Sequence, residues 1–117
     1  MLKNLEPQVV KEMLSDGQEI AFFDVREHGQ FGDGHPFFAV SVPYSLFEVR
    51  VVEVAPVRSV RMVLYDNGDG IAELAGARAE VLGYTDVSIM VNGAAGWKAA
   101  GFTLFKGENV PTKAFGE

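Results

Sequence analysis

The sequence contains no cysteine, and this absence excludes more chemistry than any other feature of its composition. Disulfides, thiolate metal sites and cysteine nucleophiles are all excluded for this chain. His28 and His35 are the only histidines, so a histidine-rich metal site is excluded as well. We therefore predict no metal site and no cofactor.

Positive charge is also scarce, and it is scattered along the chain. The sequence has 10 Lys and Arg residues against 16 Asp and Glu residues, which gives a formal net charge of −6. Nucleic-acid binding needs clustered basic side chains, so we expect no nucleic-acid partner. Long apolar runs are missing, and the N-terminus is amphipathic and carries Glu6 and Glu12, unlike a signal peptide. We expect no membrane span and a cytoplasmic location.

What the sequence does contain is an alternation of short apolar runs with helical patterns. Strand-length runs occupy residues 19–25, 39–43, 59–65 and 86–91. Helical patterns lie between Pro7 and Gly17 and over residues 45–56, 70–83 and 93–101. In the second helix, Ser45 and Glu48 have the spacing of a capping box. This order predicts an α/β domain with a mainly parallel sheet covered by helices on both faces.

A chain of 117 residues is long enough for one such domain and too short for two. We place the domain at residues 1–104, followed by an extended tail or inter-domain linker at residues 105–117. The sequence is expected to be a piece of a longer protein.

A glycine-rich turn, DNGDG at residues 66–70, joins the third strand to the third helix. Small side chains follow it at helical spacing (Ala72, Ala75, Gly76 and Ala79), so strand–turn–helix is favoured over an Asn-Gly hairpin. Such a turn gathers backbone N–H groups that suit an anion, at the end of the sheet where ligands bind. The residues after the glycines fit neither a P-loop nor a dinucleotide fingerprint. Ala77 stands where a calcium loop needs glutamate.

Several residue strings together resemble the rhodanese family of sulfurtransferases. They are DVRE at 24–27, Phe31, Gly34 with His35, Ala39, Pro43, VLY with the turn, LGYTDV at 82–87, Gly93 and GWKAAG at 96–101. Each string is weak alone, and their order and spacing make the resemblance specific over nearly the whole chain. The resemblance implies the rhodanese three-layer α/β sandwich. The last residues also resemble the join after the first, cysteine-less module of bacterial proteins with several rhodanese modules.

Active rhodaneses carry a cysteine at the first position of this turn, and its thiolate takes sulfur from a donor such as thiosulfate as a persulfide. This sequence has Asp66 there, and it has Ile71 where active loops often place an arginine. A carboxylate oxygen is hard and forms no stable equivalent of a persulfide. The resemblance therefore implies a sulfurtransferase-family domain that is itself inactive, with no residue assigned a catalytic role.

The loop of this domain is predicted to comprise Asp66, Asn67, Gly68, Asp69, Gly70 and Ile71. Asp66 is expected to occupy the anion cradle itself, accepting the N–H bonds that a thiolate would accept. Asp69 would further repel an approaching anion, by a few kcal/mol at ~4–6 Å and an effective dielectric near 20. The alternative for Asp66 is a purely local role, since aspartate commonly stabilises turns through its own side chain.

Four further residues are candidates for supporting roles that are mainly structural. Asp24 and Arg26 are expected to form an ion pair or to cap the loop, rather than to line the site. His35 is interpreted as a hydrogen-bonded structural histidine in preference to an acid–base group. Trp97 is expected to anchor the last helix in the core.

The function that fits these features is a regulatory, docking or scaffold module of a longer thiosulfate-type sulfurtransferase. Its partners would be other rhodanese modules of the same parent chain. Two alternatives remain: a module that binds a small anion or a partner at the loop, and an enzyme that uses Asp66 in phosphoryl transfer. The second needs a Mg²⁺ ligand such as Asp69, and the loop has no Lys or Arg to neutralise a phosphoryl group.

Overall fold

The computed structural model describes residues 2–27, 31, 34–36 and 38–104. It contains a five-stranded, all-parallel sheet with the strand order β1-β5-β4-β2-β3. The strands are β1 (Lys3–Leu5), β2 (Ile20–Asp24), β3 (Val40–Ser41), β4 (Arg61–Tyr65) and β5 (Val87–Met90). The helices are α1 (Pro7–Leu14), the 3₁₀ helix η1 (Tyr44–Leu46), α3 (Phe47–Val54), α4 (Ile71–Val81) and α5 (Gly93–Ala99).

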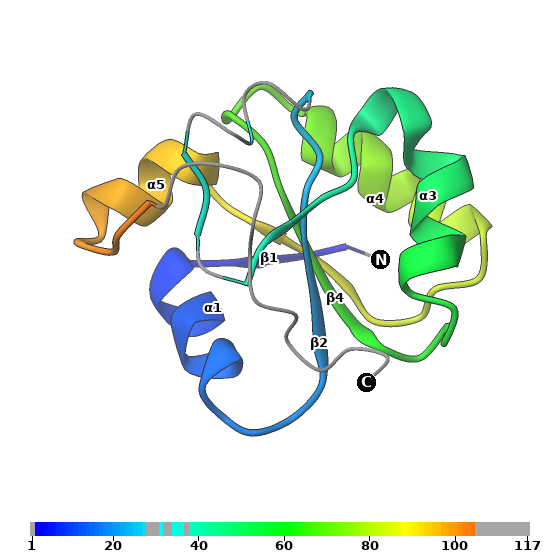
Figure 1. Cartoon of the computed structure of the whole chain (residues 1–117), viewed down its shortest axis with the longest axis horizontal. Helices are drawn as coiled ribbons and strands as arrows, with labels where there is room; N and C mark the ends of the chain where they lie inside the picture. The colour runs from blue at the N-terminus through cyan, green and yellow to red at the C-terminus, as the bar shows by residue number, and fades with distance from the viewer. Residues whose placement is uncertain (1, 28–30, 32–33, 37, 105–117) are drawn as a thin grey trace.

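Helices cover both faces of the sheet, as the alternation predicted. Helices α1 and α5 pack on one face, and α3 and α4 pack on the other (Figure 1). The central strands supply both cores because alternate side chains point to opposite faces. In β2, Phe22 contributes to the α1/α5 core and Phe23 to the α3/α4 core. Each fully buried side chain of this size contributes about 1.5–3 kcal/mol to folding.

The small side chains of α4 form the buried stripe that the sequence predicted. Ala72, Ala75, Gly76 and Ala79 are all buried against the sheet. A Cβ atom added at Gly76 would lie 2.9 Å from a methyl carbon of Leu2 and 3.2 Å from one of Ile89. The helix therefore packs close to the sheet, and this packing fixes the position of the loop that precedes it.

Two details of the sequence prediction were wrong. The capping box at Ser45 does not form, because the chain makes the 3₁₀ turn η1 there and α3 begins only at Phe47, with no side-chain cap. The Ser45 hydroxyl instead donates to Oε1 of Glu27 at 3.0 Å. The edge strand β1 was missed because it has three residues, of which Lys3 and Asn4 are exposed, and such a segment carries no apolar pattern.

The expected tail at 105–117 lies outside the described residues. Within the described part of the chain, no helix combines the length and the apolar character that a membrane span requires.

Candidate functional site

The loop between β4 and α4 lies at the carboxyl edge of the sheet, where parallel strands of this type present ligand sites. Strand β4 ends at Tyr65, and Asp66 is the first residue beyond it. Gly70 caps the N-terminus of α4 with φ of 89°, in the left-handed region that favours glycine. This conformation of Gly70 directs the chain from the loop into the first turn of α4.

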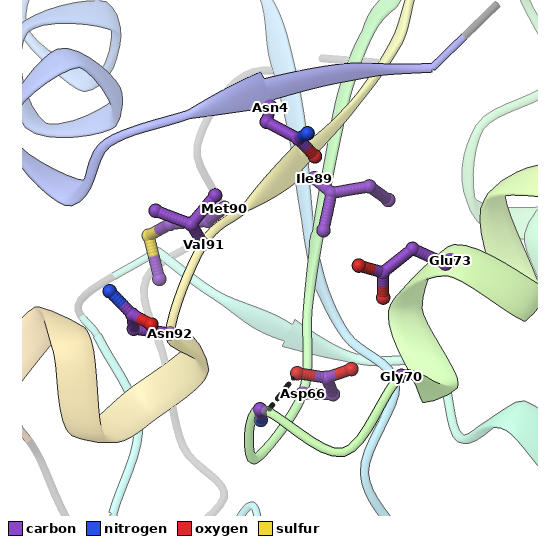
Figure 2. A pocket seen from close by; sticks show the side chains of 9 residues that line it. Asn4, Asp66, Gly70, Glu73, Ile89, Met90, Val91 and Asn92 are labelled. Atoms are coloured by element: carbon purple, nitrogen blue, oxygen red, sulfur yellow. Dashed lines mark hydrogen bonds between the residues drawn. The ribbon is translucent and has the colours of Figure 1, made fainter.

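Asp66 is buried, with 4% of its surface exposed, and its carboxylate points back into the loop (Figure 2). Its Oδ1 accepts the Gly68 N–H at 2.6 Å, and its Oδ2 accepts the Ala72 N–H at 2.8 Å. The first bond is the local turn contact that aspartate commonly makes, and the second reaches the first turn of α4. The helix N-terminus favours the negative charge there. Both carboxylate oxygens are therefore engaged by main-chain donors of the loop and helix.

The remaining loop residues are more exposed than Asp66. Asn67 and Asp69 lie at the surface, and Oδ1 of Asp69 accepts the Ile71 N–H at 3.4 Å. Ile71 is partly buried and packs against the α3/α4 core. The last position of the loop is thus occupied by an apolar side chain that is partly buried.

Two shallow hollows flank Asp66. One, of about 180 Å³, is lined by Val25, Arg26, Glu27, Tyr44, Asp66, Asp69 and Ile71. The other, of about 260 Å³, lies between the loop, the end of β5 and the first turn of α4, with Asn4, Glu73 and Asn92 among its lining residues (Figure 2). His35 and Trp97 line neither hollow. Among the described residues, no group of three or more His, Asp and Glu side chains is arranged to hold a metal ion.

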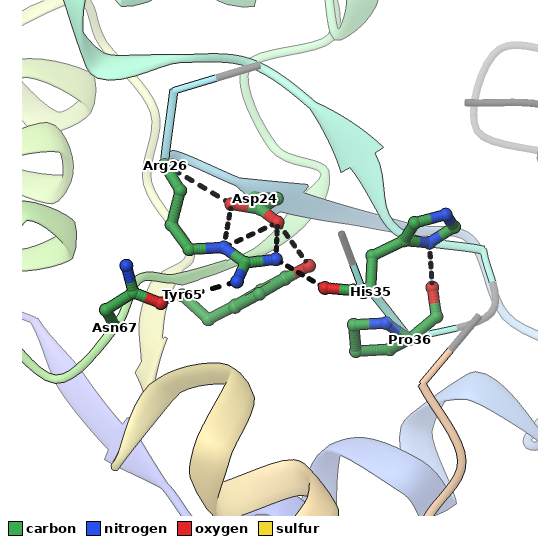
Figure 3. A network of polar contacts seen from close by, with 7 residues as sticks. Asp24, Arg26, His35, Pro36, Tyr65 and Asn67 are labelled. Atoms are coloured by element: carbon green, nitrogen blue, oxygen red, sulfur yellow. Dashed lines mark hydrogen bonds and ion pairs between the residues drawn. The ribbon is translucent and has the colours of Figure 1, made fainter. Parts of the chain in front are cut away.

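A buried polar network supports the loop from the neighbouring strand (Figure 3). Asp24, at the end of β2, has no exposed surface and binds the Arg26 guanidinium through Nε at 3.0 Å and Nη2 at 2.6 Å. Its Oδ2 also accepts the Tyr65 hydroxyl at 2.7 Å. Asp24 and Tyr65 meet because β2 and β4 pair in a register that aligns these two residues.

The Arg26 guanidinium has several partners in the protein. Besides Asp24, its Nη2 donates to the Gly34 carbonyl at 2.6 Å, and its Nη1 donates to Oδ1 of Asn67 at 3.3 Å. The structure thus places Asp24 and Arg26 in an ion pair that also reaches the loop. Among the described residues that line the 180 Å³ hollow, Arg26 is the one cation and is held by these partners, while Glu27, Asp66 and Asp69 contribute three carboxylates.

His35 and Trp97 lie in the core. His35 is 1% exposed, stacks on the Phe31 ring at 4.0 Å, and its Nδ1 donates to the Pro36 carbonyl at 2.9 Å. Trp97 is 3% exposed and packs against Phe22 and Phe102 in the α1/α5 core. Its Nε1 donates to the Thr103 carbonyl at 3.0 Å. Both side chains stabilise the fold away from the loop.

Two residues that support the loop were not foreseen. Tyr65 and Gly93 both belong to the strings that carry the family resemblance, but neither was assigned a role at the loop. Gly93 follows the neighbouring strand β5, and the N–H of the next residue, Ala94, donates to the Asp66 main-chain carbonyl at 3.0 Å. The convergence of parallel strand ends could have indicated both residues, but the register that brings them together is a tertiary property.

Tyr65 gives the network a measurable response to pH. Burial, together with the negative charge of Asp24, raises the pKa of the Tyr65 phenol well above its ordinary value of 10.0. Above that pH the unfolded chain loses this proton and the native chain keeps it. The free energy of unfolding is therefore expected to fall as pH rises above 10, by up to about 1.4 kcal/mol per pH unit for this group.

Urea denaturation at a series of alkaline pH values measures this slope, and Tyr65→Phe should reduce it. A smaller slope should remain from Tyr84, whose pKa is also raised by burial. An unchanged slope in Tyr65→Phe would show that this phenol ionises in the native protein as easily as in the unfolded chain.

A model of the rhodanese-like domain matches residues 6–100. The chain belongs to the rhodanese-like family. The match covers strands β2 to β5, the loop at Asp66 and the α-helices of the described residues, so the fold expected from the sequence resemblance is confirmed.

Solved structures of this family agree with the match. The thiosulfate sulfurtransferase of Pseudomonas aeruginosa is 34% identical, with a TM-score of 0.86 over 91% of this chain. The rhodanese-like domain of the Alr3790 protein from Anabaena sp. is 25% identical, with a TM-score of 0.80 over 91% of this chain and 80% of that one. SseA of Escherichia coli, at 21% identity and a TM-score of 0.75 over 96% of this chain and 55% of that one, shares the fold.

The rhodanese-like chain spans about one fifth of the Pseudomonas aeruginosa protein, since the alignment covers 20% of that chain. A search of curated proteins found no significant match. Homology therefore establishes a domain of the sulfurtransferase family, and the activity and partners of this chain are matters for proposal.

Proposed function

We propose that this rhodanese-like domain does not itself transfer sulfur and that it acts as a regulatory, docking or scaffold module of a longer thiosulfate-type sulfurtransferase. The observation that carries the proposal is that the Asp66 carboxylate, which the sequence resemblance aligns with the family's cysteine, accepts the N–H groups of Gly68 and Ala72. In an active member of the family, such donors would stabilise a thiolate and its persulfide. Here they are occupied by a residue that cannot carry sulfur.

The electrostatics of the hollow support the same conclusion. Thiosulfate is an anion, and the hollow presents the carboxylates of Glu27, Asp66 and Asp69. Most of the Arg26 donors are already engaged, because Asp24, Gly34 and Asn67 accept hydrogen bonds from its guanidinium. Ile71 supplies no charge. The carboxylates of the hollow would therefore repel an anionic sulfur donor, whereas an active site has to attract it.

The length of the relatives supports a modular role. The thiosulfate sulfurtransferase of Pseudomonas aeruginosa is about five times longer than the part that aligns with this chain. The proposed partners are accordingly other rhodanese modules of the same parent protein. The phosphoryl-transfer alternative is less well supported, because both oxygens of Asp66 already accept main-chain hydrogen bonds.

The test is the rate of sulfur transfer from thiosulfate to cyanide, measured for the natural chain and for Asp66→Cys. The natural chain is expected to show no turnover above the background rate. Asp66→Cys is expected to gain measurable turnover, because the N–H groups at 2.6 and 2.8 Å from the carboxylate oxygens, and the helix N-terminus, would lower the pKa of the new thiol. Adding Ile71→Arg should increase the rate further by attracting the anion.

Asp66→Ser is the matched control, because it removes the carboxylate without supplying a thiol. It should show no turnover above the background rate. Sustained turnover by the natural chain would overturn the proposal. If a folded Asp66→Cys/Ile71→Arg variant shows no turnover, the proposal that the natural chain is non-catalytic still holds. That result would show in addition that the hollow does not bind the substrate.

A further inference from the structure

The loop contains a dipeptide with a known intrinsic reactivity. Of the four asparagines in the sequence, two precede glycine: Asn67 before Gly68 and Asn92 before Gly93. In an Asn-Gly pair, the glycine main-chain nitrogen can attack the asparagine side-chain carbonyl carbon and close a five-membered succinimide with loss of ammonia. The reaction needs an acceptor for the glycine N–H proton, a polarised side-chain carbonyl and a main chain free to move. The first pair meets the first two requirements, and the two pairs differ in their main-chain surroundings.

The proton acceptor is present at the first pair. The Gly68 N–H, whose nitrogen is the attacking atom, donates to Oδ1 of Asp66 at 2.6 Å (Figure 2). A general base must lie within hydrogen-bond reach of the proton it removes, and Asp66 meets this geometric requirement. Burial among the loop N–H groups keeps the carboxylate in place.

The electrophile is polarised by Arg26. The Nη1 group of Arg26 donates to Oδ1 of Asn67 at 3.3 Å (Figure 3). When the nitrogen attacks, negative charge develops on this oxygen, and a fixed cation beside it lowers the barrier. The guanidinium is fixed because Asp24 and the Gly34 carbonyl hold its other donors.

The Asn67–Gly68 pair is more exposed than the Asn92–Gly93 pair. Both Asn67 and Gly68 are exposed, and an added Cβ atom at Gly68 would meet nothing within 4 Å. Asn92 is in the opposite situation: Gly93 is buried, and its Cα packs directly against the main-chain carbonyl of Asp66. The Asn92 carbonyl also accepts the Gly96 N–H at 2.8 Å. The second pair is therefore held in its native conformation.

We propose that Asn67 is a site of self-catalysed deamidation in which Asp66 removes the Gly68 N–H proton and Arg26 stabilises the side-chain oxyanion. A bond forms between the Gly68 nitrogen and Cγ of Asn67, and the bond from Cγ to the amide nitrogen breaks. The proton taken by Asp66 leaves with the amide group as ammonia, so the carboxylate is regenerated. Solvent water then opens the succinimide and leaves aspartate or isoaspartate at position 67.

The modification changes the loop in two ways. Either product adds a negative charge beside Arg26 Nη1, where the asparagine oxygen now lies at 3.3 Å. The isoaspartate product also inserts a methylene group into the main chain between Asp66 and Gly68, which breaks the 2.6 Å bond between them. This inference does not depend on the proposed function of the module.

The experiment follows both asparagines in one sample of the folded chain. After incubation at neutral to mildly alkaline pH, digestion with trypsin gives the peptides 62–78 and 79–98, which contain Asn67 and Asn92 separately. Mass spectrometry then measures aspartate and isoaspartate at each site. Asn67 is expected to react at least about tenfold faster than Asn92 in the folded chain, a modest share of what general-base catalysis supplies. In urea the two rates should become similar.

Asp66→Ser isolates the role of the base, since a serine hydroxyl can still accept the Gly68 N–H but does not take its proton at neutral pH. This variant is expected to slow the reaction at Asn67 about tenfold or more and to leave Asn92 unchanged. The proposal would be overturned by equal rates at the two asparagines in the folded natural chain, which needs no variant. It would equally be overturned by a folded Asp66→Ser chain that deamidates Asn67 at the natural rate.

Discussion

Replacement of Arg26 by alanine is expected to lower the free energy of unfolding by about 3–5 kcal/mol, because it leaves a buried carboxylate without its counter-ion. Asp24 has no exposed surface and takes the Arg26 guanidinium at 2.6–3.0 Å. Without Arg26, the carboxylate retains the Tyr65 hydroxyl and one main-chain N–H as donors. The Gly34 carbonyl and Asn67 would lose their donor as well.

Urea denaturation followed by circular dichroism measures this change. Arg50→Ala is the matched control, since Arg50 forms an exposed ion pair with Glu53 at 3.5 Å, and its loss should cost less than about 1 kcal/mol. The double variant Asp24→Ala/Arg26→Ala is expected to lose less stability than the sum of the single changes, because removing both charges leaves neither one buried alone. Equal losses for Arg26→Ala and Arg50→Ala would contradict a structural role for the buried pair.

Replacement of Gly93 by alanine is expected to destabilise the protein by about 3 kcal/mol or more and to displace the loop at Asp66. An ideal Cβ atom at position 93 would lie 2.0 Å from the Asp66 carbonyl oxygen and 2.9 Å from the Gly68 nitrogen. Both are main-chain atoms, so no side-chain rotation relieves the overlap. The residue also has φ of 59°, in the left-handed region that disfavours alanine.

Gly17→Ala separates the two causes of strain. Gly17 has φ of 78°, and an added Cβ atom there meets nothing within 4 Å, so its replacement should cost only the backbone term of about 1–2 kcal/mol. Urea denaturation gives the loss in free energy of unfolding for both variants. The additional loss for Gly93→Ala over Gly17→Ala measures the cost of the overlap with the loop. If the two variants lose the same stability, the close approach of Gly93 to Asp66 does not constrain the loop.

Much of the fold was predictable because it follows from local patterns. Apolar runs of strand length and helical stripes of small side chains repeat in an order that only a parallel sheet with covering helices satisfies. The stripe from Ala72 to Ala79 predicted that α4 lies close on the sheet, and these residues are buried there. The short edge strand β1 escaped prediction because pairing with β5, rather than its own side chains, makes it a strand.

The loop at residues 66–71 was easier to predict from the sequence than the residues that support it. A glycine-rich turn between an apolar strand and a helix identified residues 66–71 directly, and the spacing of the surrounding strings identified the family. The capping box at Ser45 and Glu48 shows the limit of such patterns. The chain makes a 3₁₀ turn at Ser45, and its hydroxyl bonds to Glu27, a residue distant in the sequence.

The sequence by itself determined which chemistry is absent. Without a cysteine, no thiolate of this chain can carry sulfur, whatever its fold. The tertiary structure decided how the loop at Asp66 is supported. The register between β2 and β4 aligns Asp24 with Tyr65, and Arg26 extends from this pair to Asn67. These contacts join residues about 40 positions apart, because neighbouring parallel strands are joined by a long crossover connection and their carboxyl ends meet only when the strands pair.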